Sequence, residues 1–440
     1  MKRRNVAILG AGGRDFWNFI VKYRDDPSVE IKFFTATQIP GIEKRKFPKE
    51  LAGKFYIKDI PIFPESKLVS LIEKYKITEV IFSYSDVSHE YVMHLASLVN
   101  ACGANFTLLG SSETMIKSRK PIISICAVRT GAGKSQTSRK VAEILKNDGK
   151  RVVAIRHPMP YGNLVKQNVQ RFATYRDLEK NNCTIEEREE YEPWIEMGII
   201  IYAGVDYKEI LKRAEREADV IIWDGGNNDL PFYKPDLHIV VTDPHRAGHE
   251  LLYHPGEANF RMADVIVINK IGTAPKEGIE TVLKNIKKYN PEAEIVKAES
   301  ELIISDEFSL RGKKVLIVED GPTLTHGGMA FGAGTVAAKK SGAKIISPVK
   351  SAVGSIKEIY EKYKHVHNVL PAMGYGKKQI KELEETINKV NAEVVIDGTP
   401  VKLSGLIKIN KPIVTVDYIL KERGLSLSKI LKKKRLVRNG

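Results

Sequence analysis

Cysteine is scarce and long apolar runs are missing, and both absences exclude classes of protein. Cys102, Cys126 and Cys183 are far apart, with no C-x-x-C pair, so the sequence predicts neither a disulfide framework nor a cysteine-based metal site. No apolar run approaches the roughly 20 residues that cross a bilayer. The apolar segment after the basic N-terminus is short and runs into a glycine turn, which favours a first strand over a signal peptide. We therefore expect no contact with a membrane and a cytoplasmic location.

Metal-ligand spacings are also missing, and one sign of charge dominates. The ten histidines form no HExxH or comparable pattern, so we expect no transition-metal site. Lysine and arginine number 70 against 54 aspartates and glutamates, a net charge of +16. This excess is compatible with nucleic-acid binding or with a field that gathers small anionic substrates. No zinc-finger, RRM or KH signature is present, which favours the second interpretation.

The chain of 440 residues is too long for one ordinary core and predicts two or three domains. Strand-like apolar runs alternate with amphipathic stretches almost throughout, a pattern typical of α/β folds with parallel sheets. We predict a Rossmann-like N-terminal domain, a P-loop NTPase domain with a mostly parallel sheet, and a C-terminal α/β region packed on the NTPase domain. The expected boundaries are residues 1–118, 119–310 and 311–440.

A glycine-rich turn, G-x-G-G-R-D, follows the first predicted strand. It resembles the dinucleotide fingerprint, but Asp15 stands where that fingerprint has its third glycine, and no acidic residue ends a clear second strand. We therefore expect this domain to serve structure, dimer contact or anion binding rather than to hold NAD.

The segment AVRTGAGKSQTSR, residues 127–139, carries the strongest functional signal. It follows the apolar strand IISICAV and precedes an amphipathic stretch, so a strand, a glycine loop and a helix come in the order that phosphate binding requires. Backbone N–H groups of the loop would cradle phosphates, with Lys134 on the β- and γ-phosphates and Ser135 on Mg²⁺. The predicted nucleotide-binding residues of this segment are Gly131, Ala132, Gly133, Lys134, Ser135 and Gln136.

The first glycine of the common P-loop pattern is missing, because Val128 occupies its position. The stretch R-T-G-A-G-K-S instead resembles the deviant Walker A motif of the SIMIBI class, with Arg129 in the place of the signature lysine. In that class the cation reaches the nucleotide across a dimer. Arg129 would do this, or would contact phosphates in its own subunit; both readings stay open, and a homodimer is plausible.

Two later motifs complete an NTPase pattern. The apolar run before Asp224 predicts a Walker B strand, and we expect Asp224 and Ser135 to hold Mg²⁺. A further strand ends in Asn269 and Lys270, where P-loop proteins often read the base. Gly272 replaces the aspartate of the guanine-reading N-K-x-D motif, which favours ATP over GTP.

Three more predicted strands end in cations, histidines and hydroxyls, at the edge where open α/β sheets bind ligands. A single histidine there is more often a core or surface residue, but the repetition indicates a second, anion-binding site. Its predicted members are Arg156, His157, Tyr161, His245, Arg246, Thr323, His326 and Gly327.

Taken together, CAVRTGAGKSQTSR, RHPMPYG, DVIIWDGGNND, VVTDPHRAGHE and EDGPTLTHGGMAFGAG resemble the cyclic 2,3-diphosphoglycerate synthetase family of archaea. The resemblance implies ATP- and Mg²⁺-dependent closure of 2,3-diphosphoglycerate into a cyclic phosphoanhydride, with release of ADP and phosphate, and a link to thermoprotection. Such chemistry relies on positioning and charge neutralisation. The residues expected to carry it are Lys134, Arg129, Asp224, Arg246 and His326.

Two alternatives remain at this point. A SIMIBI-class GTPase or ATPase switch, or a metallochaperone, would hydrolyse nucleotide without a small acceptor, and a metallochaperone would need a metal cluster that the sequence does not show. A basic nucleic-acid-binding protein would explain the charge, but the Walker motifs argue against it.

Overall fold

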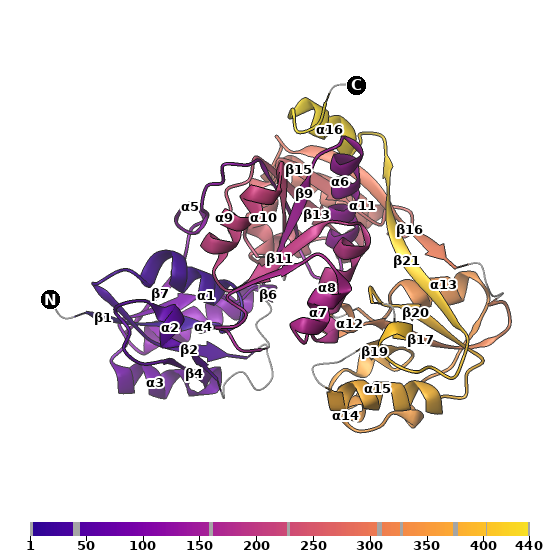
Figure 1. Ribbon diagram of the computed structural model, residues 1–440, viewed down its shortest axis with the longest axis horizontal. Helices are drawn as coiled ribbons and strands as arrows, with labels where there is room; N and C mark the ends of the chain where they lie inside the picture. Colours follow the sequence, from indigo (N-terminus) through magenta and orange to yellow (C-terminus); the bar gives the residue numbers. More distant parts are fainter. Residues whose placement is uncertain are drawn as a thin grey trace.

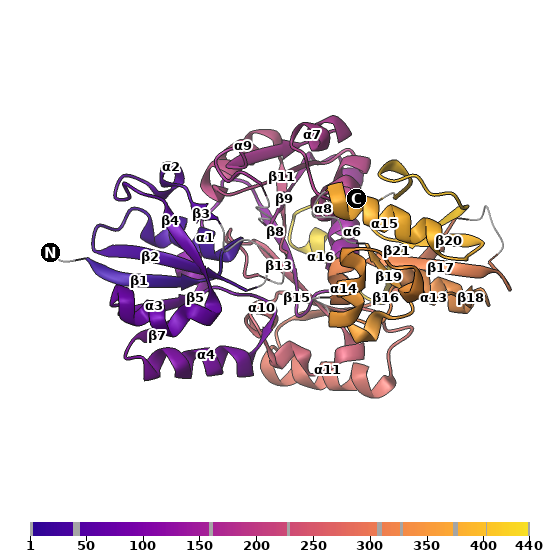
Figure 2. The same ribbon diagram turned by 90° about the horizontal axis from the view of Figure 1, so that it is seen from below.

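The computed structural model describes residues 3–37, 45–157, 162–226, 229–305, 310–325, 329–372, 377–401 and 403–438. Three parts lie in a row along its longest axis: an N-terminal sheet with its helices, a central sheet that carries the P-loop, and a C-terminal α/β part (Figure 1). The view from below shows the same order (Figure 2). No helix in the described ranges is long and apolar enough to cross a membrane.

The N-terminal sheet has the strand order β3-β4-β2-β1-β5-β7. Its strands are β1 (Arg4–Leu9), β2 (Val29–Ala36), β3 (Lys46–Phe47), β4 (Ile60–Pro64), β5 (Glu79–Phe82) and β7 (Asn105–Leu108). Helices α1 (Arg14–Asn18), α3 (Leu68–Tyr75) and α4 (His89–Ala101) connect them. In the glycine turn after β1, the Asp15 carboxylate accepts the N–H groups of Gly12 and Gly13 at 2.8 and 3.0 Å. These donors are the ones a dinucleotide phosphate would use.

The central sheet runs β10-β11-β9-β12-β8-β13-β15-β16 and is parallel from β11 to β16. Its strands are β8 (Ile122–Ala127), β9 (Val152–Arg156), β10 (Val169–Phe172), β11 (Ile200–Gly204), β12 (Val220–Asp224), β13 (Leu237–Thr242), β15 (Val265–Ile268) and β16 (Glu294–Ile304). Most of these strands are buried on both faces, which explains their continuous apolar sequences. Because the strands are parallel, the polar residues that follow them lie together at the carboxyl-end edge of the sheet.

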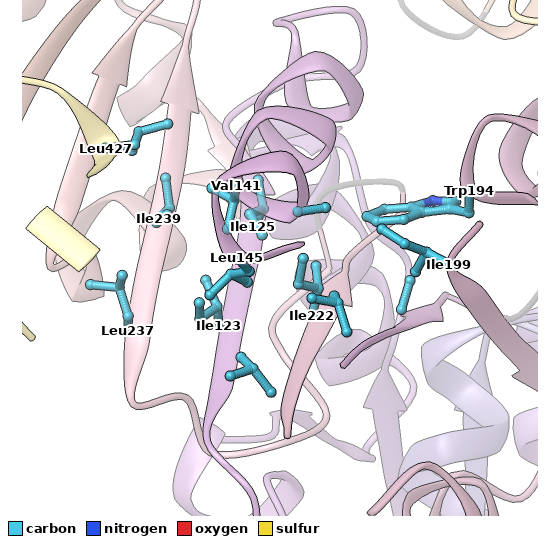
Figure 3. Packing of buried hydrophobic residues seen from close by; sticks show 14 of the residues in the cluster. Ile123, Ile125, Val141, Leu145, Trp194, Ile199, Ile222, Leu237, Ile239 and Leu427 are labelled. Atoms are coloured by element: carbon cyan, nitrogen blue, oxygen red, sulfur yellow. The ribbon is translucent and has the colours of Figure 1, made fainter. Parts of the chain in front are cut away.

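Helix α6 (Lys134–Asn147) fixes the P-loop to this sheet. Its Val141 and Leu145 lie four residues apart, on one face of the helix, and are fully buried against Ile123 and Ile125 of β8 (Figure 3). Each such side chain contributes roughly 1.5–3 kcal/mol by leaving water. This packing sets the direction in which the N-terminus of the helix points.

The C-terminal part continues the central sheet through one long strand, β21 (Ile413–Arg423). β21 pairs antiparallel with β16 and parallel with β20 (Val394–Gly398), so it joins the two sheets edge to edge. The remaining strands are β17 (Lys314–Asp320), β18 (Lys344–Ile345) and β19 (Leu370–Ala372). The chain then returns to the central core, where α16 (Leu427–Lys433) buries Leu427 and Leu431. The predicted α/β class with a mostly parallel sheet is confirmed, whereas β21 is not among the predicted strands.

Candidate active site

A cavity of about 820 Å³ opens beside the P-loop. The P-loop and the start of α6 form one wall, and the middle parts of β16 and β21 form another. Opposite them lie α8 (Ile185–Glu196), the end of β17 and α13 (Ala333–Lys340). A cavity of this size suits a nucleotide or a drug-sized ligand, and it lies at the carboxyl ends of the parallel strands, where α/β folds bind ligands.

The loop between β8 and α6 has the backbone of a phosphate-binding turn. Gly131 and Gly133 adopt φ of +79° and +112°, the left-handed region that favours glycine. A Cβ on Gly133 would lie 2.0 Å from Asn269 Nδ2, so only glycine fits. The first N–H groups of α6 have no partner within the helix and face the cavity with the positive end of the helix dipole.

Asn269 and Lys270 hold this loop in place through hydrogen bonds to its backbone carbonyls. The Asn269 amide is fully buried and donates to the Ala132 carbonyl at 2.9 Å and to Ser300 Oγ at 3.2 Å. Lys270 Nζ donates to the Gly131 carbonyl at 2.7 Å and to Asp243 at 2.8 Å. β15 ends next to the P-loop, so both side chains contact the loop backbone; base reading by Asn269 and Lys270 stays a prediction. The preference for ATP over GTP rests on Gly272 in place of the guanine-reading aspartate and is unaffected by these contacts.

Replacing Asn269 with alanine is expected to lower the free energy of unfolding by about 1–3 kcal/mol, because the buried Ala132 carbonyl loses its donor. The same change should weaken nucleotide binding, since the loop is no longer held. Urea unfolding and nucleotide titration check both effects. Asn147→Ala, at the exposed C-terminal end of α6, is the control and should change neither. Unaltered stability of Asn269→Ala would show that the hydrogen bond from Asn269 to the Ala132 carbonyl does not stabilise the fold.

Lys134 and Asp224 meet at the base of the cavity. Lys134 Nζ lies 2.6 Å from Asp224 Oδ1, which also accepts from Ser138 Oγ at 2.8 Å, and Arg156 Nη1 lies 3.0 Å from Oδ2. Burial would raise the pKa of Asp224, but the charges of Lys134 and Arg156 outweigh it and hold that pKa at about 2. Burial lowers the pKa of Lys134. Lys134 therefore forms an ion pair with Asp224 next to the phosphate-binding loop.

Arg129 is held within its own chain, where the N-terminal part meets the P-loop. Its Nε donates to Asp86 Oδ1 at 2.7 Å, and its guanidinium lies 3.7 Å from the ring centroid of Tyr253. Thr130 donates to the same aspartate through its hydroxyl and its backbone N–H. The N-terminal part therefore supplies a carboxylate to the edge of the P-loop, a contact that the sequence did not reveal.

The predicted second anionic site is only partly assembled at the cavity. His245 lines it and lies 3.0 Å from Thr273 Oγ1. Arg156 also lines the cavity, but its guanidinium forms ion pairs with Asp224, at 3.0 Å, and with Glu190, at 2.5 Å.

Other predicted members of that site lie elsewhere. Among the described lining residues, neither His157 nor Arg246 occurs. His157 is buried 2.6 Å from Asp229, and Arg246 donates to the Thr130 carbonyl and to Asp243. Both side chains therefore serve internal contacts rather than the cavity wall. Tyr161, His326, Gly327 and the side chain of Thr323 lie outside the described residues.

Acidic side chains form much of the wall opposite the P-loop: Glu189 and Glu190 of α8 and Glu319 and Asp320 at the end of β17. Glu319 and Asp320 belong to the motif EDGPTLTHGGMAFGAG that sequence reasoning singled out, whereas Glu189 and Glu190 were missed. The available signal was the acidic run TIEEREEYEP, which lies on a largely buried helix.

A strand–loop–helix cradle, a buried lysine at its helix start and an aspartate ending the neighbouring strand define a P-loop NTPase domain. No family model matches the chain. Over 424 residues it is 62% identical to "Arginine synthetase ArcE" of Thermococcus kodakarensis, covering 96% of this chain and 95% of that protein. The chain belongs to the arginine synthetase ArcE family, and is an enzyme with ligase-like activity.

More distant similarities complete the comparison. The chain is 24% identical over 346 residues to "Cyclic 2,3-diphosphoglycerate synthetase" of Thermococcus sibiricus, covering 72% of this chain and 77% of that protein. The resemblance read from the motifs is therefore a distant relationship. Among solved structures, LpxK from Aquifex aeolicus in complex with ATP aligns over 84% of this chain and 98% of its own, with 14% identity and a TM-score of 0.44. Likeness at that level carries no argument about function.

Proposed function

We propose that this enzyme makes arginine in an ATP-dependent reaction that releases ADP and phosphate. The observation that carries the proposal is the 62% identity to an arginine synthetase over almost the full length of both chains. The phosphate-binding loop beside a cavity of about 820 Å³ supports it, because that space suits a nucleotide or a drug-sized ligand.

The chemistry follows from the product. The guanidinium carbon of arginine carries three nitrogens, and forming the last C–N bond replaces an oxygen that leaves only after activation. The γ-phosphoryl group passes to that oxygen and ADP is released. A nitrogen nucleophile then attacks the carbon and loses a proton, and the C–O bond breaks with release of phosphate. The protein's tasks are to position the two reactants, neutralise charge and exclude water.

The described residues match these tasks. The α6 N-terminus and Lys134 would hold the phosphates, with Lys134 leaving Asp224 as the nucleotide arrives. Ser135 and Asp224 offer a hydroxyl and a carboxylate, oxygen donors of the kind that Mg²⁺ prefers. The described part of the chain holds no group of three or more Asp, Glu, His or Cys side chains arranged for a metal, so such an ion would depend on phosphate oxygens and water. When bound, it would neutralise charge on the β- and γ-phosphates.

Cyclisation of 2,3-diphosphoglycerate is the second candidate, favoured by the quoted motifs and the 24% match. Its substrate carries about five negative charges, which several cations must balance. The wall opposite the P-loop carries four acidic residues, Glu189, Glu190, Glu319 and Asp320, against Lys339 and Lys340, an excess that would disfavour such a polyanion. The carboxylates therefore favour the first candidate.

One experiment separates the candidates. The enzyme is incubated with ATP, Mg²⁺ and ammonium chloride, together with either 2,3-diphosphoglycerate or the ureido amino acid that has an oxygen in place of one guanidinium nitrogen of arginine. Mass spectrometry detects arginine, and phosphorus NMR detects a cyclic phosphoanhydride. We expect arginine and ADP in equal amounts. A cyclic signal without arginine would favour the second candidate, and ADP release that ignores both acceptors would favour an NTPase switch.

A further inference from the structure

Carboxylates from three elements that are far apart in the sequence lie at the acidic wall of the cavity or near it. Glu189 and Glu190 of α8 and Glu319 and Asp320 at the end of β17 line the cavity. Asp397, near the end of β20, is buried and is not among the described lining residues. β17 and β20 are hydrogen-bonded neighbours, with Val318 opposite Asp397. Their carboxyl ends therefore place acidic groups on one side of the cavity, facing α8.

Glu189 is the most unusual member of this wall. Its residue is only 6% exposed, it lines the cavity, and its Oε1 has no hydrogen-bond partner. Burial, together with the charges of Asp320, Glu186, Glu190 and Asp397, raises the pKa of Glu189 well above its ordinary value. A buried carboxyl oxygen without a partner, among other carboxyls, is costly, and such groups with a shifted pKa cluster at functional sites, where a ligand supplies the missing hydrogen bond.

The positive charge of this wall comes from Lys339 and Lys340 of α13, which line the cavity, and from Arg156, which pairs with Glu190. Within the described ranges, the donors to Glu319 are uncharged and include the N–H groups of Gly332 and Thr335 and the Thr335 hydroxyl. Asp397 likewise accepts from Thr399 and Leu403. Across the ranges that the structure describes, no ion pair involves Glu189, Glu319 or Asp397, and no group of such side chains is arranged for a metal.

We infer that Glu189, with Asp320 and Glu319 beside it, forms a subsite for a protonated nitrogen group of the substrate or product, an ammonium or a guanidinium. The inference rests on the proposed function in naming a nitrogen cation, and it adds where that cation binds. An ion-pair chain runs from Glu190 through Arg156 to Asp224 and on to Lys134. The subsite therefore lies next to the place where the γ-phosphate would be held.

Binding without turnover tests the subsite. The probes are L-arginine, measured by calorimetry, and methylguanidinium and ammonium chlorides, measured as competitors against it with sodium chloride at equal ionic strength. We expect Glu189→Gln to weaken arginine binding at least about tenfold, because one charged hydrogen bond is lost. The same substitution should leave the Tm equal to or above that of the unaltered protein, since a neutral amide replaces a carboxyl whose ionised form is disfavoured by burial and by its acidic neighbours. Glu196→Gln, on the exposed face of the same helix, should change neither quantity.

Competition by methylguanidinium would assign the subsite to a guanidinium, and competition by ammonium alone to an ammonium group. The inference would be overturned if neither competed better than sodium chloride, or if Glu189→Gln bound arginine as tightly as the unaltered protein. Failure of the proposed function would look different: arginine binding would still depend on Glu189, but no arginine would form from the ureido amino acid. Arginine formation with unchanged KM in Glu189→Gln would overturn the subsite alone.

Discussion

Replacing Lys134 with alanine is expected to lower ATP-dependent turnover by about 10³-fold or more while the chain stays folded. Lys134 is the cation closest to Asp224, and it lies at the N-terminus of α6, where the transferred phosphoryl group would be held. The fold survives because Arg156 and Ser138 still contact Asp224, so no buried charge is left without a partner. ADP release and circular dichroism measure the two effects.

Lys140→Ala is the matched control for that prediction. Lys140 lies on the same helix but is partly exposed and pairs with Glu143, so its loss should leave turnover unaltered. Turnover by Lys134→Ala within a few-fold of the unaltered enzyme would contradict the assignment of the P-loop as the phosphoryl-transfer site. Loss of folded structure in Lys134→Ala would instead give the residue a structural role.

Replacing Arg156 with methionine is expected to lower the free energy of unfolding by about 3–5 kcal/mol. Its side chain is 6% exposed and pairs with both Asp224 and Glu190. Methionine fills a similar volume but removes the described ion-pair partner of Glu190 and leaves Lys134 as the remaining cation on Asp224, beside the Ser138 hydroxyl. Urea unfolding measures the loss.

Two further variants sharpen that test. Arg151→Met removes an exposed arginine that pairs with Asp219 just before the same strand and should change stability little. Combining Arg156→Met with Glu190→Gln should recover part of the lost stability, because one unpaired carboxylate is removed. If the double variant were no more stable than the single one, repulsion at Glu190 would not be the cause.

The N-terminal part has a structural connection to the P-loop that bears on Arg129. Asp86 immediately precedes β6 (Val87–Ser88), which pairs with β14 (Tyr253–His254), and Arg129 is held between Asp86 and Tyr253. The structure thus provides partners for Arg129 within one chain. Its contact with phosphates, in the same subunit or across a dimer, stays a prediction.

The P-loop and Walker B strand were predictable because their signals are local. A buried parallel strand needs a continuous apolar run, and the phosphate loop needs glycines with positive φ before a helix start. These requirements act within about 15 residues and leave a readable pattern around Gly131, Gly133 and Lys134. The same reasoning located Asp224 at the end of its strand.

The sequence by itself determined the α/β class, the phosphate-binding loop and the lysine on it, because secondary-structure periodicity and loop stereochemistry depend on near neighbours. Tertiary structure alone decided which side chains meet. It placed Asn269 under the loop, brought Asp86 to Arg129 across 43 residues of chain, paired β21 with β16, and gathered Glu189 with the carboxylates of β17 and β20. Such contacts depend on how distant elements pack, and no local pattern encodes that packing.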